Sequence, residues 1–419
     1  MSMINRTLIE QAVSATVELL RFAQPADAAL SAFFRAQRCG PRERAFIAEA
    51  AYTVLRRKRS LTAKVGNDAT ARQLTLAALL SDGGLSQRTL ENALPARDST
   101  WLSELKARDP KLSLADQSDL PDWLYERLAV QMPKDELQQL ARALNQPAPL
   151  DLRVNTLKAE RATVLAQLQR EGLAAEACPF APDGIRMTDK THLAKHPLFL
   201  DGSLEVQDEG SQLLGYLLAP KRGEMVVDFC AGAGGKTLLL GALMRSSGRL
   251  YAFDVSEKRL AKLKPRLARS GLSNVHPVAI AHENDQRVKR LAGKCDRVLV
   301  DAPCSGLGTL RRNPDLKWRQ SPESVLELIA KQTAILASAA RLLKKGGRLV
   351  YATCSLLPEE NAMIVAAFLA AHPVFARRSA SAVLAAQGIQ LDMRGDDLQL
   401  LPHVHGTDGF YAAVLERVE

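Results

Sequence analysis

The sequence predicts an α/β fold, with a doubly wound, mostly parallel sheet toward the carboxyl end, preceded by an all-α domain and a small α+β domain. Apolar residues recur at helical spacing from residue 5 to about residue 140. From about residue 205, short apolar runs typical of buried strands alternate with helical stretches, as in a parallel sheet with crossover helices. Between these regions, residues 150–155 alternate like a strand. We therefore expect three domains, at residues 1–143, 144–204 and 205–419.

Composition limits the possible classes of protein. The 419 residues are 47% hydrophobic and 24% charged, which is typical of a soluble globular protein with two or three domains. Lys and Arg (56) exceed Asp and Glu (46), and this surplus favours a polyanionic partner such as nucleic acid, although a merely basic protein would also carry it. We find no secretory signal, membrane-spanning run or metal-site spacing, so we expect a cytoplasmic protein without a metal.

The helical region carries a run of basic residues on its polar face. The run consists of Arg35, Arg38, Arg42 and Arg44, and it ends in residues 56–59 (RRKR). Solvated charge is the usual explanation of such a run, and contact with phosphates is the alternative. Both interpretations remain open at this point.

Two cysteines follow strand-like runs in the third domain. Cys304 comes after residues 298–300, and Cys354 comes after residues 349–351. Parallel sheets bind ligands beyond the carboxyl ends of their strands, and neighbouring strands lie about 4.8 Å apart. If the two strands are neighbours, both thiols therefore face one crevice. The pair favours nucleophilic chemistry, whereas a free cysteine more often packs in a core, which we expect for Cys39, Cys178 and Cys295.

A glycine-rich turn precedes both cysteines, at residues 228–237 (DFCAGAGGKT). Glycines let the backbone approach a ligand, and the helix that follows offers free N–H donors. The turn departs from the phosphate-loop pattern at Cys230 and from the dinucleotide pattern at Thr237. Asp254 ends the next strand, where a carboxylate can accept hydrogen bonds from ribose hydroxyls. This order favours S-adenosylmethionine as cofactor, and a structural turn with an acidic helix cap is the alternative.

Short motifs along the chain carry a family resemblance. They lie at residues 152–156 (LRVNT), 205–211 (EVQDEGS), 301–306 (DAPCSG), 312–318 (RNPDLKW), 353–355 (TCS) and 358–361 (PEEN). Together they resemble the RNA (cytosine-5) methyltransferases, in particular the bacterial ribosomal-RNA branch. The helical start resembles the NusB-like RNA-binding domain of that branch. The resemblance implies the class I S-adenosylmethionine-dependent methyltransferase fold, with a seven-stranded sheet.

The resemblance also implies roles for individual residues. Cys354 would be the nucleophile, and Cys304 would assist product release. Two positions depart from the family pattern: Ala233 stands where proline is usual, and Asp285 is followed by glutamine instead of glycine, with Glu283 close by as an alternative contact. The implied cofactor site comprises Cys230, Ala231, Gly232, Ala233, Gly234, Gly235, Lys236, Asp254, Asp285 and Asp301.

Cytosine chemistry explains why such residues are needed. C5 of cytosine is a poor nucleophile, and a thiolate that adds to C6 turns C5 into an enamine-like carbon that accepts a methyl group. Asp301 is our candidate for contact with N3 and the exocyclic amine. The base must be unstacked to be reached, which favours a loop, a bulge or incompletely folded RNA. We expect Arg311, Arg312 and Lys317 to bind phosphates, and Trp318 either to stack on a base or to be buried.

Several functions stay open on the sequence alone. The first is methylation of cytosine C5 in RNA, with 16S ribosomal RNA the expected substrate and transfer RNA the alternative. Others are a DNA methyltransferase that uses Cys304 as nucleophile, a non-catalytic ribosome-assembly factor that binds RNA, and a nucleoside triphosphatase that uses residues 235–237. For the first, we expect a monomer with RNA as partner and neither membrane nor metal.

Overall fold

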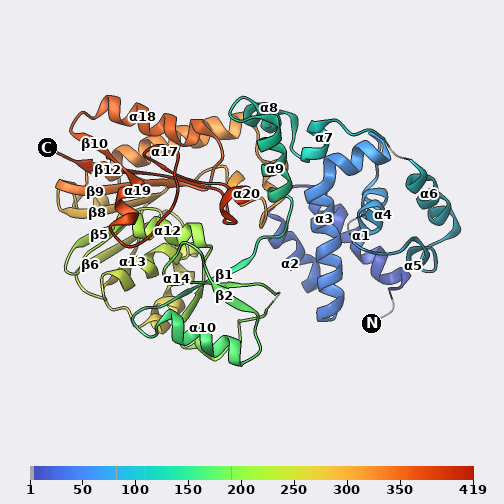
Figure 1. Ribbon diagram of the computed structural model, residues 1–419, viewed down its shortest axis with the longest axis horizontal. Coiled ribbons are helices and arrows are strands. Elements are labelled where there is room, and N and C mark those ends of the chain that lie inside the picture. Colours follow the sequence, from blue (N-terminus) through green and yellow to red (C-terminus); the bar gives the residue numbers. More distant parts are fainter. Residues whose placement is uncertain (1–3, 82, 109, 190) are drawn as a thin grey trace. The chain divides into compact units, whose positions relative to one another are not determined.

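The computed structural model describes residues 4–81, 83–108, 110–189 and 191–419, and the chain divides into two compact units (Figure 1). The first unit runs to Pro147 and also includes Thr309–Pro322. The second comprises Ala148–Gly308 and Glu323–Glu419. The three domain ranges expected from the sequence remain predictions. The membership of residues 309–322 in the first unit was not foreseen.

The first unit is built from helices that bury one apolar face each. In the first helix, Leu8, Ile9 and Ala12 are buried at helical spacing, and the Asn5 side chain caps its amino end by accepting from the N–H of Leu8. The described helices of this unit are α1 (Arg6–Leu20), α2 (Ala26–Ala36), α3 (Pro41–Val65), α4 (Ala71–Ser81), α5 (Gln87–Glu91), α6 (Ala96–Ala107), α7 (Leu114–Ser118), α8 (Asp122–Ala129), α9 (Lys134–Leu144) and α16 (Leu316–Arg319).

Helix α16 brings two polar side chains into the interior of the first unit. The ammonium of Lys317 donates to the carbonyl oxygen of Arg56 (2.8 Å) and to Oδ1 of Asn145 (2.9 Å), and only 1% of the Lys317 surface is exposed. The indole N–H of Trp318 donates to the carbonyl of Leu55 at 2.8 Å. Burial lowers the pKa of Lys317 to about 7. This position does not favour the expected phosphate contact, and Lys317 takes no part in the function proposed below.

Substituting Lys317 by alanine is expected to destabilise the protein by about 3 kcal/mol, because it removes the donor to Oδ1 of Asn145 and to the carbonyl of Arg56 and opens a void. Urea denaturation of the full chain measures this loss, and Lys345→Ala, at an exposed position, is the matched control. If the Lys317→Ala variant is as stable as the wild type but binds RNA more weakly, the structural role is contradicted and the phosphate contact expected from the sequence is supported.

The second unit begins with a small four-stranded antiparallel sheet of order β2-β3-β1-β4. Buried side chains join it to the larger sheet: Arg153 donates to the carbonyl of Gly235 at 2.8 Å, and both oxygens of Glu205 pair with arginines of α14 (Glu257–Ser270). Its elements are β1 (Leu150–Val154), α10 (Arg161–Arg170), β2 (Ala175–Ala177), β3 (Gly184–Met187), α11 (Pro197–Leu200) and β4 (Leu204–Val206).

The larger sheet has the order β10-β12-β9-β8-β5-β6-β7, with β11 paired to β12. The five strands from β9 to β7 are parallel, and β12 and β10 are antiparallel to their neighbours. The strands are β5 (Met225–Asp228), β6 (Arg249–Asp254), β7 (Val275–Ala279), β8 (Cys295–Asp301), β9 (Leu343–Thr353), β10 (Phe375–Arg378), β11 (Leu398–Leu400) and β12 (Phe410–Arg417). This confirms the predicted α/β class with a mostly parallel sheet of seven strands, to which β11 is a short addition.

Helices cover both faces of the larger sheet. Successive residues of β8 belong to different apolar clusters: Leu299 packs with Leu213 and Leu239, and Val300 packs with Leu336 and the helix that follows β9. Figure 1 shows α12, α13 and α14 on one face and α17 and α18 on the other. The remaining helices are α12 (Glu209–Leu218), α13 (Gly235–Leu243), α15 (Gln286–Lys289), α17 (Pro322–Ala340), α18 (Ala362–Ala371), α19 (Ala380–Ala385), α20 (Pro402–His405) and the 3₁₀ turns η1 (Leu307–Thr309) and η2 (Pro358–Glu360).

No helix in the described ranges combines the length and the apolar character that crossing a membrane requires.

Candidate active site

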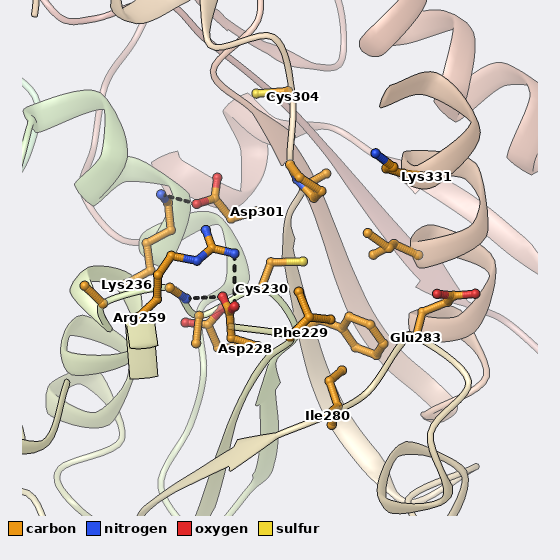
Figure 2. Close-up of a pocket in the computed structure, with 18 of the residues that line it drawn as sticks. Asp228, Phe229, Cys230, Lys236, Arg259, Ile280, Glu283, Asp301, Cys304 and Lys331 are labelled. Atoms are coloured by element: carbon orange, nitrogen blue, oxygen red, sulfur yellow. Dashed lines mark hydrogen bonds and ion pairs between the residues drawn. The ribbon is translucent and has the colours of Figure 1, made fainter. Parts of the chain in front are cut away.

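A cavity of about 940 Å³ lies at the carboxyl ends of the central parallel strands of the second unit. Its walls come from the turn after β5, from Asp254 at the end of β6, from the segment after β7 and from the segments after β8 and β9. Figure 2 shows these side chains converging from separate strands. A parallel sheet with helices on both faces places ligands at this edge.

The glycine turn is shaped by two residues with positive φ. Gly232 has φ +57°, and a Cβ built on it would meet nothing within 4 Å, so its face is open. Gly234 has φ +83°, and a Cβ there would lie 2.2 Å from the side chain of Leu263. Gly232 therefore leaves room for a ligand against the backbone, whereas Gly234 permits close packing on α14.

Two buried carboxylates flank this turn. Oδ2 of Asp254 accepts the N–H of Gly232 at 2.8 Å, while Oδ1 pairs with the half-exposed Arg259 at 3.0 Å. Asp228 accepts the hydroxyl of Thr237 at 2.6 Å through Oδ2, whereas its buried Oδ1 has no hydrogen-bond partner. Burial raises the pKa of Asp228 to about 7. An unpaired carboxylate oxygen, a second carboxylate and an open glycine face fit the ammonium and ribose groups of S-adenosylmethionine.

Substituting Asp228 by asparagine is expected to stabilise the protein increasingly as the pH rises from about 4 to 7. The folded-state pKa is raised above the ordinary value of 3.8, so the wild type loses about 1.4 kcal/mol per pH unit across this window, and the variant does not. Thermal unfolding of both proteins from pH 4 to 8 measures the divergence. Parallel pH profiles would show that Asp228 ionises normally.

Lys236 and Asp301 form an ion pair at the cavity wall. The ammonium of Lys236 lies 2.7 Å from Oδ2 of Asp301. Figure 2 marks this pair with a dashed line. Burial alone would lower the pKa of Lys236, but the Asp301 carboxylate outweighs it, so the pKa of Lys236 is raised. Lys236 therefore stays charged at the cavity wall, and a carboxylate and an ammonium lie side by side there.

The two cysteines meet in the same cavity. Strands β8 and β9 are parallel neighbours, as the sequence analysis required, and Sγ of Cys304 lies 3.4 Å from Sγ of Cys354. The hydrogen bond with Cys354, and then burial, raise the pKa of Cys304 well above its ordinary value. Cys304 thus stays a thiol near neutral pH. As a thiol, Cys304 can donate a hydrogen bond to the sulfur of Cys354.

Most of the residues expected at the site line the cavity, and a few do not. Gly234 packs instead on α14, and Asp285 caps α15 by accepting from the N–H groups of Ala281 and Arg287. Glu283, the alternative to Asp285, does line the cavity. The expected residues that line it are Cys230, Ala231, Gly232, Ala233, Gly235, Lys236, Asp254, Asp301, Cys304 and Cys354.

Other lining residues were not singled out from the sequence. Gln207 and Ser211 belong to the matched motif at residues 205–211, so that motif was the available signal. Arg259 and Lys331 lie on helices, where no local pattern distinguishes them from solvated residues. The three basic residues expected to bind RNA all belong to the first unit, where Arg311 and Lys317 are buried and Arg312 is half-buried.

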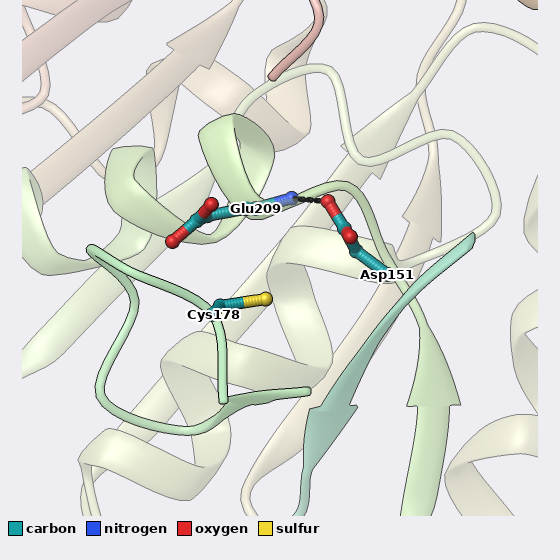
Figure 3. Close-up of side chains that lie close together, drawn as sticks. All are labelled: Asp151, Cys178 and Glu209. Carbon is teal, nitrogen blue, oxygen red and sulfur yellow. Dashed lines mark hydrogen bonds between the residues drawn. The ribbon is translucent and has the colours of Figure 1, made fainter. Parts of the chain in front are cut away.

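A second cluster of polar side chains lies in the second unit, on residues that do not themselves line the cavity. Asp151, Cys178 and Glu209 are all buried, and Figure 3 shows them side by side. Arg186 pairs with Asp151 at 2.7 Å and with Glu209 at 3.4 Å. Glu209 also accepts two backbone N–H groups, from residues 180 and 181. Because the carboxylates already have these partners, we interpret the cluster as a structural link between β1, β3 and α12.

Two family models match separate parts of the chain. A family model described as 16S rRNA methyltransferase RsmB/F matches residues 215–416, and a model of the ferredoxin-like domain of RsmF/B-like methyltransferases matches residues 120–194. The probable ribosomal RNA small subunit methyltransferase B of Synechocystis sp. is 38% identical over 308 residues, which cover 73% of this chain and 69% of that protein.

Solved structures are similar as well. The crystal structure of PH0851 is similar with a TM-score of 0.80 and 27% identity, and the similarity covers 99% of each chain. That of a methyltransferase homologue from Pyrococcus horikoshii gives a TM-score of 0.62 and 28% identity, over 74% of this chain and all of the other.

Proposed function

Because the chain belongs to the family of 16S rRNA methyltransferases described as RsmB/F, we propose that it methylates C5 of a cytosine in 16S ribosomal RNA through a covalent cysteine adduct. The family places it among the S-adenosylmethionine-dependent RNA methyltransferases, in agreement with the fold and cofactor predicted from the sequence. The observation that carries the finer proposal is the pair of thiols, 3.4 Å apart, in the cavity that the glycine turn enters.

The cofactor contacts follow from the cavity walls. When bound, S-adenosylmethionine supplies an electrophilic methyl group. Asp254 would hold the ribose, and Arg259, which is half exposed, can move aside from it. Asp228 would accept from the ammonium group of the cofactor with its unpaired oxygen. Glu283 takes the place that the sequence analysis assigned to Asp285, because it lines the cavity and Asp285 is engaged as a helix cap.

The protein's own residues account for the proposed steps on the base. The Cys354 thiolate adds to C6 of cytosine, the π electrons of the C5=C6 double bond shift into the C4–C5 bond, and N3 takes up the negative charge. C5 is then an enamine carbon and is nucleophilic. Asp301 and the charged Lys236 face this region together, so they can bind the Watson–Crick edge and the charge that develops on it. After methylation, removal of the C5 proton lets the sulfur of Cys354 leave, and Cys304, in contact with that sulfur, assists this step.

Methylation assays with the purified full chain test the proposal. Labelled S-adenosylmethionine is offered with deproteinised 16S ribosomal RNA, transfer RNA or duplex DNA, and bisulfite sequencing maps any 5-methylcytosine. We expect incorporation at a cytosine of 16S ribosomal RNA. If transfer RNA or DNA is methylated and 16S ribosomal RNA is not, the proposed substrate is wrong and the methylated nucleic acid takes its place. Binding of RNA without binding of S-adenosylmethionine would favour the assembly factor. ATP turnover is the check for the triphosphatase reading.

A further inference from the structure

A single buried carboxylate contacts both cysteine-bearing segments. Glu360 is fully buried at the end of η2. Its Oε1 accepts the backbone N–H of Ser305 at 2.8 Å, and its Oε2 accepts the hydroxyl of Ser305 at 2.6 Å. The hydroxyl of Ser355 donates to the same Oε2. These serines directly follow Cys304 and Cys354 in the chain, so the carboxylate joins the two segments one residue beyond the thiols.

Glu360 is itself held from other directions. Gln332, on α17, donates from Nε2 to Oε1 of Glu360 at 2.9 Å and to the carbonyl of Pro303 at 3.0 Å. The hydroxyl of Tyr351, on β9, donates to the backbone carbonyl of Glu360 at 2.7 Å. The carboxylate therefore accepts from four donors on three residues, Ser305, Ser355 and Gln332, which offsets the cost of its burial and holds it in one place.

We propose that Glu360 is a positioning residue that holds the two cysteine-bearing segments together and thereby keeps the thiols at contact distance. The sulfurs lie 3.4 Å apart on segments that leave the sheet from separate strands. A backbone hydrogen bond from the N–H of Gly308 to the carbonyl of Cys354 (2.8 Å) also joins these segments, but it lies four residues beyond Cys304, whereas the contacts of Glu360 lie one residue beyond each thiol. Glu360 does not line the cavity, so it acts through the cysteines and not on the base.

The charge of Glu360 adds a second effect. The hydrogen bond with Cys354 raises the pKa of Cys304 most, followed by burial and by the charge of Cys354. The negative charge of Glu360 raises this pKa further. This contribution favours the protonated form of Cys304 and with it the hydrogen bond toward Cys354.

Two substitutions separate geometry from charge. In Glu360→Gln, the amide oxygen can accept from Ser305 and Gln332, and the amide N–H₂ can donate to the serine hydroxyls, so the geometry is kept and the charge is lost. Glu360→Ala removes both. Glu327→Gln, at an exposed position of α17, is the matched control for loss of a carboxylate.

The first experiment measures the distance between the thiols and needs no substrate. Dibromobimane joins two nearby thiols as each sulfur displaces one bromide, and peptide mass mapping identifies the Cys304–Cys354 product. We expect cross-linking about tenfold slower in Glu360→Ala, and near the wild-type rate in Glu360→Gln and Glu327→Gln, with the pH profile of Glu360→Gln moved to lower pH. Wild-type cross-linking in a folded Glu360→Ala variant would overturn the proposal.

The second experiment rests on the proposed function. In Glu360→Ala we expect kcat to fall about 100-fold while the KM for S-adenosylmethionine stays unchanged, and a covalent protein–RNA species to accumulate because Cys304 is misplaced for release. Glu360→Gln should retain most activity. A loss of activity without the adduct would point to a merely structural role. If the wild type itself forms no 5-methylcytosine, the proposed function fails, and the cross-linking result still decides the role of Glu360.

Discussion

Replacing Cys354 by alanine is expected to abolish methyl transfer to RNA, with a loss on the order of 10⁴-fold or more in kcat. Without the Cys354 thiolate, burial still raises the pKa values of the remaining thiols of the cavity, Cys230 and Cys304, so they add poorly to C6, and C5 stays a poor nucleophile. Incorporation of labelled methyl groups into 16S ribosomal RNA measures the loss. S-adenosylmethionine should still bind, because the carboxylates and glycines of the cofactor region are unchanged.

The control for this substitution is Cys295→Ala, which alters a cysteine buried in the core of the same unit. We expect it to lower stability modestly and to leave the chemistry intact. Calorimetric titration with S-adenosylmethionine shows whether each variant retains a folded cofactor site. Substantial methylation by a folded Cys354→Ala variant would contradict the nucleophilic role of this residue.

Replacing Cys304 by alanine is expected to trap a covalent protein–RNA species. Cys354 can still add to C6 and the methyl group can still be transferred, but release is slowed because the thiol that contacts the Cys354 sulfur is gone. The adduct appears as a slow-migrating band on a denaturing gel, and nuclease treatment should remove it.

The two variants together test the assignment of roles. An adduct that forms in Cys354→Ala and not in Cys304→Ala would exchange them, with Cys304 as the nucleophile. The raised pKa of Cys304 argues against that exchange, because a thiol that stays protonated near neutral pH adds poorly to C6. A double substitution should give neither product nor adduct.

Much of the sheet and the cavity could be predicted from the sequence because the signals are local. Strand-like runs ending in Asp228, Asp254 and Asp301 mark one edge of a parallel sheet, and the structure has strands ending at these residues. The apolar runs before Cys304 and Cys354 predicted two strands but left open whether these are neighbours, and the pairing of β8 with β9 shows that they are. Strands β10 and β11 were not expected from the sequence. They have four and three residues, which is too short for an alternation of apolar and polar residues to be recognised.

Other features depend on contacts between distant residues. Local pattern could not separate Glu283 from Asp285, because both are acidic residues in one segment, and only the fold shows which one lines the cavity. Likewise, Lys317 appears in the sequence as a basic residue next to an aromatic one, and it is buried against residues more than 170 positions away.

By itself, the sequence determined the fold class, the cofactor turn and the two thiols. The spacing of apolar residues indicates the strands, and the short motifs that follow them contain the residues at the strand ends. Only the tertiary structure decided that residues 309–322 belong to the helical unit and that Glu360 joins the cysteine segments. The reason is physical. Burial of a polar side chain depends on partners that chain folding brings together from far apart, and no local spacing encodes them.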